Sequence, residues 1–106
     1  MEIKNNNISI HLIVCNTFFK RLKGFMFKKN IRCALEFPKC NSIHTFFMLK
    51  PIDVIMTDKD YKILYIFKNL KPYRVIFPKK NVYYTFELPI NKFEFNINEK
   101  IKITEK

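Results

Sequence analysis

The sequence predicts an all-β fold, a small β-barrel or sandwich of about seven strands with one short helix. Short runs rich in Ile, Val, Phe and Tyr recur roughly every ten residues, a spacing typical of such folds. The prolines fall between these runs or at their ends, as expected if the runs are hydrogen-bonded strands. Only one segment has apolar residues at the spacing of a helix.

The predicted strands follow the β-branched and aromatic runs of the chain. Two of them, IDVIMT (52–57) and KILYIF (62–67), flank the turn segment DKDY and predict a hairpin. The full set in chain order is ISIHLIV (8–14), ALEF (34–37), SIHTFFML (42–49), IDVIMT (52–57), KILYIF (62–67), RVIF (74–77), VYYTFEL (82–88) and KIKI (100–103).

The predicted helix covers residues 17–23, where either Asn16 or Thr17 can act as the N-cap. Gly24 follows two basic residues, Arg21 and Lys23, in the same segment and is expected at the C′ position in the left-handed conformation. It is the only glycine in the chain, while the other predicted turns use Asn or Asp, which tolerate positive φ better than other non-glycine residues. This contrast indicates that position 24 requires φ > 0.

The composition fits one small folded unit. The chain has 106 residues, so we expect a single domain over residues 1–106 with its own core. The formal net charge of +11 is compatible with nucleic acid as a partner. However, 17 of the 20 basic residues are Lys, they are scattered, and the chain is rich in the residues that AT-rich codons favour. We therefore interpret the charge as compositional drift, and nucleic-acid binding is the less favoured alternative.

The three cysteines, Cys15, Cys33 and Cys40, are odd in number, and no pair has C-x-x-C spacing. Reduced thiols in a cytoplasmic protein fit this pattern best. The opening segment MEIKNNNISIHLIVC is neither a signal peptide nor a membrane span, because its apolar stretch is short and contains a histidine.

Four segments resemble one known family in the same order along the chain. NTFFKRLKGFMFK is similar to its T-x-x-x-R-x-x-G-L-M-x-R segment, and FPKCNSIHTFFMLKPIDVIMTDKD is similar to P-C-x-S-I-H-T-F-F-M-R-F-P-I-D-V-x-F-L-D. FELPIN resembles L-E-L-P-x-G, and INEKIKI resembles I-x-x-G-D-x-I. On these motifs the chain, over about residues 8–104, is identified as a member of the domain of unknown function 192 (DUF 192) family.

The resemblance implies a compact, mostly β domain with one short helix, and it implies no established activity. Several residues depart from the family pattern: Lys20 stands where Glu is frequent, Phe25 replaces Leu, Lys28 replaces Arg, and Asn91 and Asn98 occupy glycine positions. The two asparagines support the drift interpretation. The loss of Glu at position 20 weakens any role for a Glu–Arg pair there.

Cys40 and His44 are the first candidate chemical pair, as metal ligands or as a nucleophile and its base. If both lie on one regular strand, four residues separate them by about 13 Å, too far for a shared zinc ion or a hydrogen bond. Only a bulge or turn near Asn41 and Ser42 would bring them together. We therefore favour a buried or rim histidine that is bonded to its neighbours, and we expect no metal site and no cofactor.

Asp53 is the second candidate, because a carboxylate inside the apolar PIDVI run must be paired if it faces inward. Arg21, near the end of the helix, is its candidate partner. The pair is interpreted either as a structural link between helix and sheet or as part of a ligand pocket. Glu87 in FELP has the same ambiguity. Met26 and Met48 are expected to fill the core.

These residues lead to three functional hypotheses. The preferred one is a non-enzymatic binding or accessory module whose pocket is lined by Arg21, His44, Thr45, Asp53 and Glu87, with an unknown small ligand, peptide or protein as its partner. The first alternative is a small, hydrolase-like enzyme that uses His44 or Asp53 as acid or base, although no catalytic motif is present. The second alternative is a basic nucleic-acid-binding domain. We expect a monomer or weak dimer.

Overall fold

The computed structural model describes residues 1–105, without the side chain of Phe18. The predicted fold class is confirmed, since the described residues form a mostly β structure with one short helix. The elements are β1 (Glu2–Asn5), β2 (Ile8–Val14), α1 (Phe18–Lys23), β3 (Ala34–Pro38), β4 (Ile43–His44), β5 (Ile52–Thr57), β6 (Ile63–Leu70), β7 (Val75–Ile76), β8 (Tyr84–Leu88) and β9 (Lys102–Thr104).

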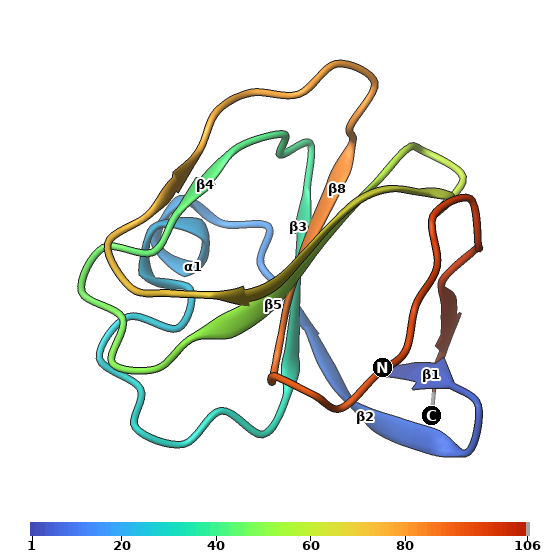
Figure 1. The fold of residues 1–106 in the computed structure, drawn as a ribbon, viewed down its shortest axis with the longest axis horizontal. Coiled ribbons are helices and arrows are strands. Elements are labelled where there is room, and N and C mark those ends of the chain that lie inside the picture. Colours follow the sequence, from blue (N-terminus) through green and yellow to red (C-terminus); the bar gives the residue numbers. More distant parts are fainter. Residues whose placement is uncertain (106) are drawn as a thin grey trace.

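Seven strands form one curled sheet with the order β6-β5-β8-β3-β2-β1-β9, and β4 and β7 form a separate antiparallel pair. The β2–β3 contact is parallel, while the other neighbours in the sheet are antiparallel. The curl brings the two edges together, because the Ile63 N–H donates to the Glu99 carbonyl (2.9 Å) and the Ile101 N–H donates to the Tyr61 carbonyl (3.0 Å). The sheet is therefore a half-barrel whose edges meet along a short segment (Figure 1).

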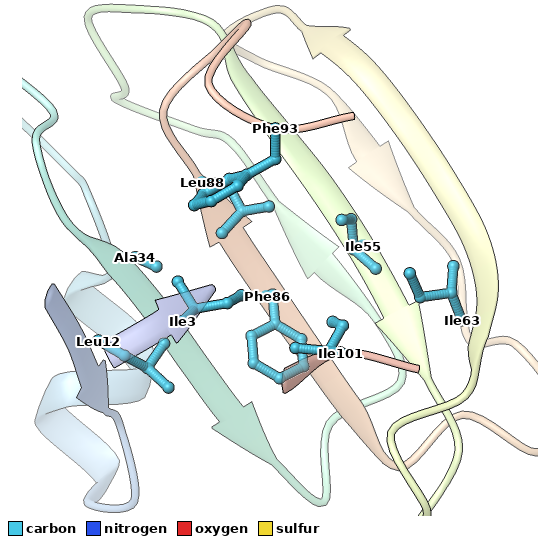
Figure 2. Packing of buried hydrophobic residues seen from close by; sticks show 9 residues of the cluster. All are labelled: Ile3, Leu12, Ala34, Ile55, Ile63, Phe86, Leu88, Phe93 and Ile101. Atoms are coloured by element: carbon cyan, nitrogen blue, oxygen red, sulfur yellow. The ribbon is translucent and has the colours of Figure 1, made fainter. Parts of the chain in front are cut away.

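The inner face of the half-barrel encloses the first core. Phe86 of β8 lies at its centre with no exposed surface, and side chains from β1, β2, β3 and β5 converge on it (Figure 2). The C-terminal segment closes the space with Phe93 and Ile101. The buried members are Ile3, Leu12, Ala34, Ile55, Ile63, Phe86, Leu88, Phe93 and Ile101.

The outer face of the same strands carries a second core. Every residue of β5 is buried, because Ile52, Val54 and Met56 face outward while the residues between them face the half-barrel interior. Such a strand reads as a continuous apolar run, as IDVIMT does. The outer core is covered by the segment around α1 and by the β4–β7 pair, and Figure 1 shows α1 and β4 together on the side of the sheet away from β1.

Most predicted elements match those observed. The hairpin of β5 and β6 is confirmed, and the β2 and β5 bounds are those predicted. Thr17 is the N-cap of α1, since its side chain accepts a hydrogen bond from the Lys20 N–H (3.2 Å). Asn91 and Asn98, at the family's glycine positions, have φ of 59° and 74°. They take the conformation that glycine would otherwise provide.

One strand prediction was wrong, and one observed strand was not predicted. Only Ile43 and His44 of the predicted strand 42–49 are extended and paired, and the chain then turns, with φ of 64° at Phe47. β1 was not predicted, because its four residues EIKN contain one apolar side chain, although the asparagines that follow are a turn signal. Asn6, with φ of 55°, lies in the turn of the β1–β2 hairpin.

Gly24 has φ of 46°, the sign that the sequence indicates, but its ψ of −126° is not that of the left-handed helix. This part of φ/ψ space is open essentially to glycine alone, so asparagine could not replace it as it does in other turns.

The described residues contain no helix long and apolar enough to cross a membrane.

Candidate functional site

A cleft of about 490 Å³ lies between the end of α1, the residues that follow it, and β4. Its floor is the outer face of the main sheet, where Phe37 of β3 and Glu87 of β8 line it together with Met48. The volume is within the range of small-molecule sites, which are mostly apolar with a few placed polar groups. Apolar lining comes from Leu22, Phe25, Met26, Phe37, Ile43 and Met48, and polar lining from Asn16, Arg21, Lys23, Cys40, Ser42, His44 and Glu87.

The Glu87 carboxyl group lies at the floor of this cleft and is 4% exposed. Its neighbours on the adjoining strands are Leu35 and Val54, so its surroundings within the sheet are apolar. Burial raises the pKa of Glu87 from 4.5 to about 8, while a hydrogen bond from the backbone of Phe25 lowers it in part. Glu87 Oε1 has no hydrogen-bond partner within the described residues. At neutral pH the group is therefore mostly a protonated acid with unused hydrogen-bonding capacity.

His44 lies on the opposite wall, at the end of the short strand β4. Its Nδ1 accepts a hydrogen bond from the Phe46 N–H (3.2 Å), and its ring stacks on that of Phe46 with centroids 5.0 Å apart. Because Nδ1 is the acceptor, the neutral imidazole carries its proton on Nε2. The histidine is half-buried and held in one orientation, as expected for a rim residue bonded to its neighbours.

Arg21 lines the cleft from the last turn of α1. Its side chain is exposed, and Nη2 donates to the Lys39 carbonyl (3.1 Å). A guanidinium group has five N–H donors, so this one bond leaves most of its capacity for an anion. Lys23 lines the same cleft and adds a second positive charge.

The structure thus brings Arg21, His44 and Glu87 together and keeps Asp53 away from them. The expected Arg21–Asp53 pair was wrong, because Asp53 faces the half-barrel interior and pairs with Lys68 (Nζ to Oδ2, 3.0 Å). Its two carboxylate oxygens also accept bonds from the Asn69 N–H (2.8 Å) and the Asn91 N–H (3.2 Å). Asp53 thus lines a separate cavity of about 190 Å³ together with Lys68, and both of its carboxylate oxygens accept hydrogen bonds.

Thr45 was expected in the pocket but does not line the cleft. It is 1% exposed, and its hydroxyl group donates to the Lys71 carbonyl (2.7 Å) and accepts from the Arg74 N–H (2.8 Å). These bonds hold the loop before β7 against the turn after β4. Its role in the fold is to connect two loops.

Cys40 and His44 line the same cleft, but they do not lie on one regular strand as expected from the sequence. β4 begins only at Ile43, and the Cys40 thiol turns back to donate to the Ser42 carbonyl (Sγ to O, 3.1 Å). Within the part of the chain that the structure describes, no three His, Cys, Asp or Glu side chains are grouped to hold a metal ion. The polar lining of the cleft consists of hydrogen-bonding side chains and the positive charges of Arg21 and Lys23.

The sequence reasoning missed several of these features. Met26 was expected in the core but is half-buried and lines the cleft, whereas Met48 is buried and forms part of its floor. Glu36 is another buried carboxyl group with an unpaired Oε1, and burial raises its pKa although Tyr61 donates to Oε2 (3.2 Å). It faces the half-barrel interior. The signal was present, since Glu36 interrupts the apolar run ALEF as Glu87 interrupts FEL.

Comparison with known proteins gives a consistent result. The profile of the DUF192 family, described as "Uncharacterized ACR", matches residues 1–104. The chain is similar to UPF0127 proteins of Thermococcus sibiricus (36% identity, 77% of this chain and 56% of that protein), Thermococcus kodakarensis (41%, 73% and 52%) and Pyrococcus horikoshii (39%, 83% and 80%). It spans about half the length of the two Thermococcus relatives.

Two solved structures share the fold. One is a proposed transcription regulator from Sinorhizobium meliloti, with a TM-score of 0.77 and 13% identity over 95% of this chain and 89% of that one. The other is a protein of unknown function from Novosphingobium aromaticivorans, with a TM-score of 0.71 and 16% identity over 85% and 71%. At these identities the likeness concerns the fold alone.

Proposed function

This chain belongs to the DUF192 family, and we propose that it is a non-enzymatic binding module that takes a small ligand or the end of a peptide in the cleft. The observation that carries the proposal is the buried, unpaired Oε1 of Glu87 at the floor of a ligand-sized cleft. Leaving a buried polar atom without a hydrogen-bond partner costs free energy. A ligand that supplied the missing hydrogen bond to Oε1 would remove this cost, and its binding would be favoured.

The polar groups indicate what the ligand would look like. Its body would be apolar, to match Leu22, Phe37 and Ile43 on the walls. A carbonyl or other acceptor would meet the protonated Glu87, and a carboxylate or phosphate would meet Arg21 at the rim. Small amphiphilic acids and the C-terminal residue of a peptide both have this arrangement.

A binding module is favoured over the enzyme alternative because both candidate catalytic residues, Asp53 and His44, already use polar atoms in hydrogen bonds within the protein. Asp53 lies on the other face of the sheet with its oxygens engaged. His44 remains in the cleft, but its Nδ1 is committed to a backbone N–H. The groups left in the cleft are well placed for recognition.

The test uses octanoate and phenyl phosphate as defined probes, each with an apolar body and one anionic group. Both are titrated into the full chain while amide NMR signals are followed. We expect the amide signals of Gly24, Phe25 and His44 to show the largest chemical-shift changes, because these residues line the cleft. Shifts confined to other surfaces, or none at millimolar probe, would show that the proposal is wrong.

Two variants locate the effect. Arg21→Gln should weaken binding of both probes about fivefold to tenfold by removing the charged partner. Arg32→Gln is the matched control, because it removes the same charge from an exposed arginine outside the cleft. Equal losses in the two variants would mean that the probes respond only to overall charge.

A further inference from the structure

Beside the cleft, five aromatic side chains form a continuous row, which we call the aromatic row. Phe27 lies against Phe47 (ring centroids 5.8 Å apart), and Phe47 lies against Tyr73 (6.0 Å). Tyr73 continues to Phe46 (6.3 Å), which stacks on His44 (5.0 Å). The rings are not core residues, since Phe27 is 65% exposed, Tyr73 59% and Phe47 50%.

The backbone under this row is in an unfavourable conformation. Phe27, Phe47 and Tyr73 have φ of 62°, 64° and 62°, in the left-handed region that bulky residues rarely enter. Of the ten non-glycine residues with positive φ within the described residues, five are asparagine, so the chain elsewhere uses a residue suited to this conformation. Aromatic residues at these three positions cost stability and bury little surface, which is a pattern associated with function.

Specific hydrogen bonds hold the three loops that carry the row. The Phe27 N–H donates to the Phe47 carbonyl (3.1 Å), and the Tyr73 N–H donates to the Thr45 carbonyl (2.9 Å). The buried Thr45 hydroxyl group fixes the same loop through the Lys71 carbonyl and the Arg74 N–H. These hydrogen bonds therefore hold the loops that carry the rings in place without a bound partner.

The segments that carry the row hold charges of one sign only. Lys28 and Lys29 follow Phe27, Lys50 follows Phe47, and Lys71 and Arg74 flank Tyr73, while no Asp or Glu lies in residues 27–29, 44–50 or 71–74. The six acids that are not buried lie in β1, in the β5–β6 turn and in the C-terminal segment, which border the half-barrel: Glu2, Asp58, Asp60, Glu94, Glu99 and Glu105.

From these observations we propose that the aromatic row and its basic surroundings bind single-stranded nucleic acid. Exposed rings in a row offer stacking surfaces for successive bases, and surrounding Lys and Arg attract the phosphate backbone. Arg74 and Lys71 lie beside Tyr73, while Lys28 and Lys50 lie near Phe27 and Phe47 in sequence. Rings that lie against one another in a row match the stacking of successive bases, and a membrane surface is tested as the alternative below. The row shares His44 with the cleft, but Phe27, Phe47 and Tyr73 are not among the residues that line the cleft, so variants at these three positions test the row separately.

The experiment measures fluorescence anisotropy of a labelled oligothymidylate of about 12 nucleotides with the full chain at low salt. Phe47→Asn and Tyr73→Asn each remove a ring and place a residue that accepts positive φ. We expect each to weaken binding about tenfold while the melting temperature stays the same or rises. A purely structural ring would give the opposite result, with a lower melting temperature and unchanged binding.

Two matched controls accompany these variants. Phe77→Asn removes a ring that is 73% exposed but lies outside the row, and should leave the affinity unchanged. Arg74→Glu should weaken binding and reduce its salt dependence more than Lys102→Glu, which makes the same charge change on β9.

Phosphatidylserine vesicles and polyglutamate are tested in parallel. The proposal is supported if the oligonucleotide binds and the loss is specific to Phe47→Asn and Tyr73→Asn. It is overturned if the oligonucleotide does not bind, or if its binding does not depend on the row. It is also overturned if only the vesicles or only polyglutamate show the dependence on the row, which would assign the surface to a membrane or an acidic peptide.

Discussion

Glu87 Oε1 lies 3.2 Å from the position that a Cβ atom would take on Gly24. The only glycine of the chain and its most strongly perturbed carboxyl group therefore depend on each other. Gly24 lets the backbone after α1 pass close to Glu87 on the sheet, and both residues line the cleft. The floor of the cleft is made by this contact.

Gly24→Ala should destabilise the fold by roughly 1–3 kcal/mol, because φ of 46° with ψ of −126° is unfavourable for alanine and the added methyl group meets the carboxyl oxygen. Urea unfolding measures the free energy. Asn98→Ala, at another turn with positive φ, is the comparison and should cost less, because it has the backbone effect without a buried carboxyl group beside it. Equal losses would mean that the contact with Glu87 is unimportant.

Glu87→Gln should change how stability depends on pH. The folded-state pKa of Glu87 is raised from 4.5 to about 8 by burial, so between these values the folded state binds more protons than the unfolded state. The contribution of this group is therefore favourable at low pH and is lost as pH rises from 4.5 to 8, with a slope of at most about 1.4 kcal/mol per pH unit. Glutamine removes this titration.

The measurement is the free energy of unfolding of both proteins at several pH values across that window. Glu87→Gln should lose less stability than the wild type as the pH rises. Glu36→Gln provides a second case, because burial also raises the pKa of Glu36 on the other face of the sheet. Parallel curves for the wild type and Glu87→Gln would contradict a raised pKa in the folded state.

Asp53→Ala should cost about 1–3 kcal/mol of stability, because it removes the buried carboxylate that accepts from the N–H groups of Asn69 and Asn91. Lys68→Ala should cost less than about 1 kcal/mol, since the lysine side chain is 48% exposed and its ion pair is screened by solvent. Thermal and urea unfolding test both. If Asp53→Ala folded normally but lost binding of octanoate, Asp53 would belong to a ligand site after all.

Thr45→Val should loosen the frame of the aromatic row. Valine keeps the shape but removes the hydroxyl group that bonds the Lys71 carbonyl and the Arg74 N–H, and we expect a loss of about 1–3 kcal/mol. Hydrogen exchange should accelerate at Tyr73 and Arg74 and remain unchanged in β8. Uniform acceleration across the sheet would indicate global destabilisation without local loosening. Thr17→Val, at the α1 N-cap, is a second threonine whose loss should act locally on the helix.

The strands could be predicted because their signals are local. The β-branched residues of IDVIMT and ISIHLIV predict strands, and the turn segment DKDY separates β5 from β6. The prediction failed at residues 45–49, where the chain turns and leaves Phe46, Phe47 and Leu49 exposed. Local propensity favoured a strand there, but the bonds of Thr45 with the loop before β7 favoured the turn.

The candidate site was only partly predictable because strand facing is a tertiary property. Glu87 and Asp53 are both carboxyl groups inside buried strands, but Glu87 faces outward to the cleft and Asp53 faces the half-barrel interior. A shift of one residue in register would exchange the two faces. The sequence does not say which face α1 will cover.

By itself the sequence determined the fold class, most strands, the need for glycine at position 24 and the choice of Asn16 or Thr17 as N-cap, because each follows from residues close together in the chain. Only the tertiary structure decided that Arg21, His44 and Glu87 share a cleft and that five rings form a row. These groups come from chain segments that are far apart in sequence, and their meeting depends on sheet curvature, register and loop hydrogen bonds that form only when the whole chain packs.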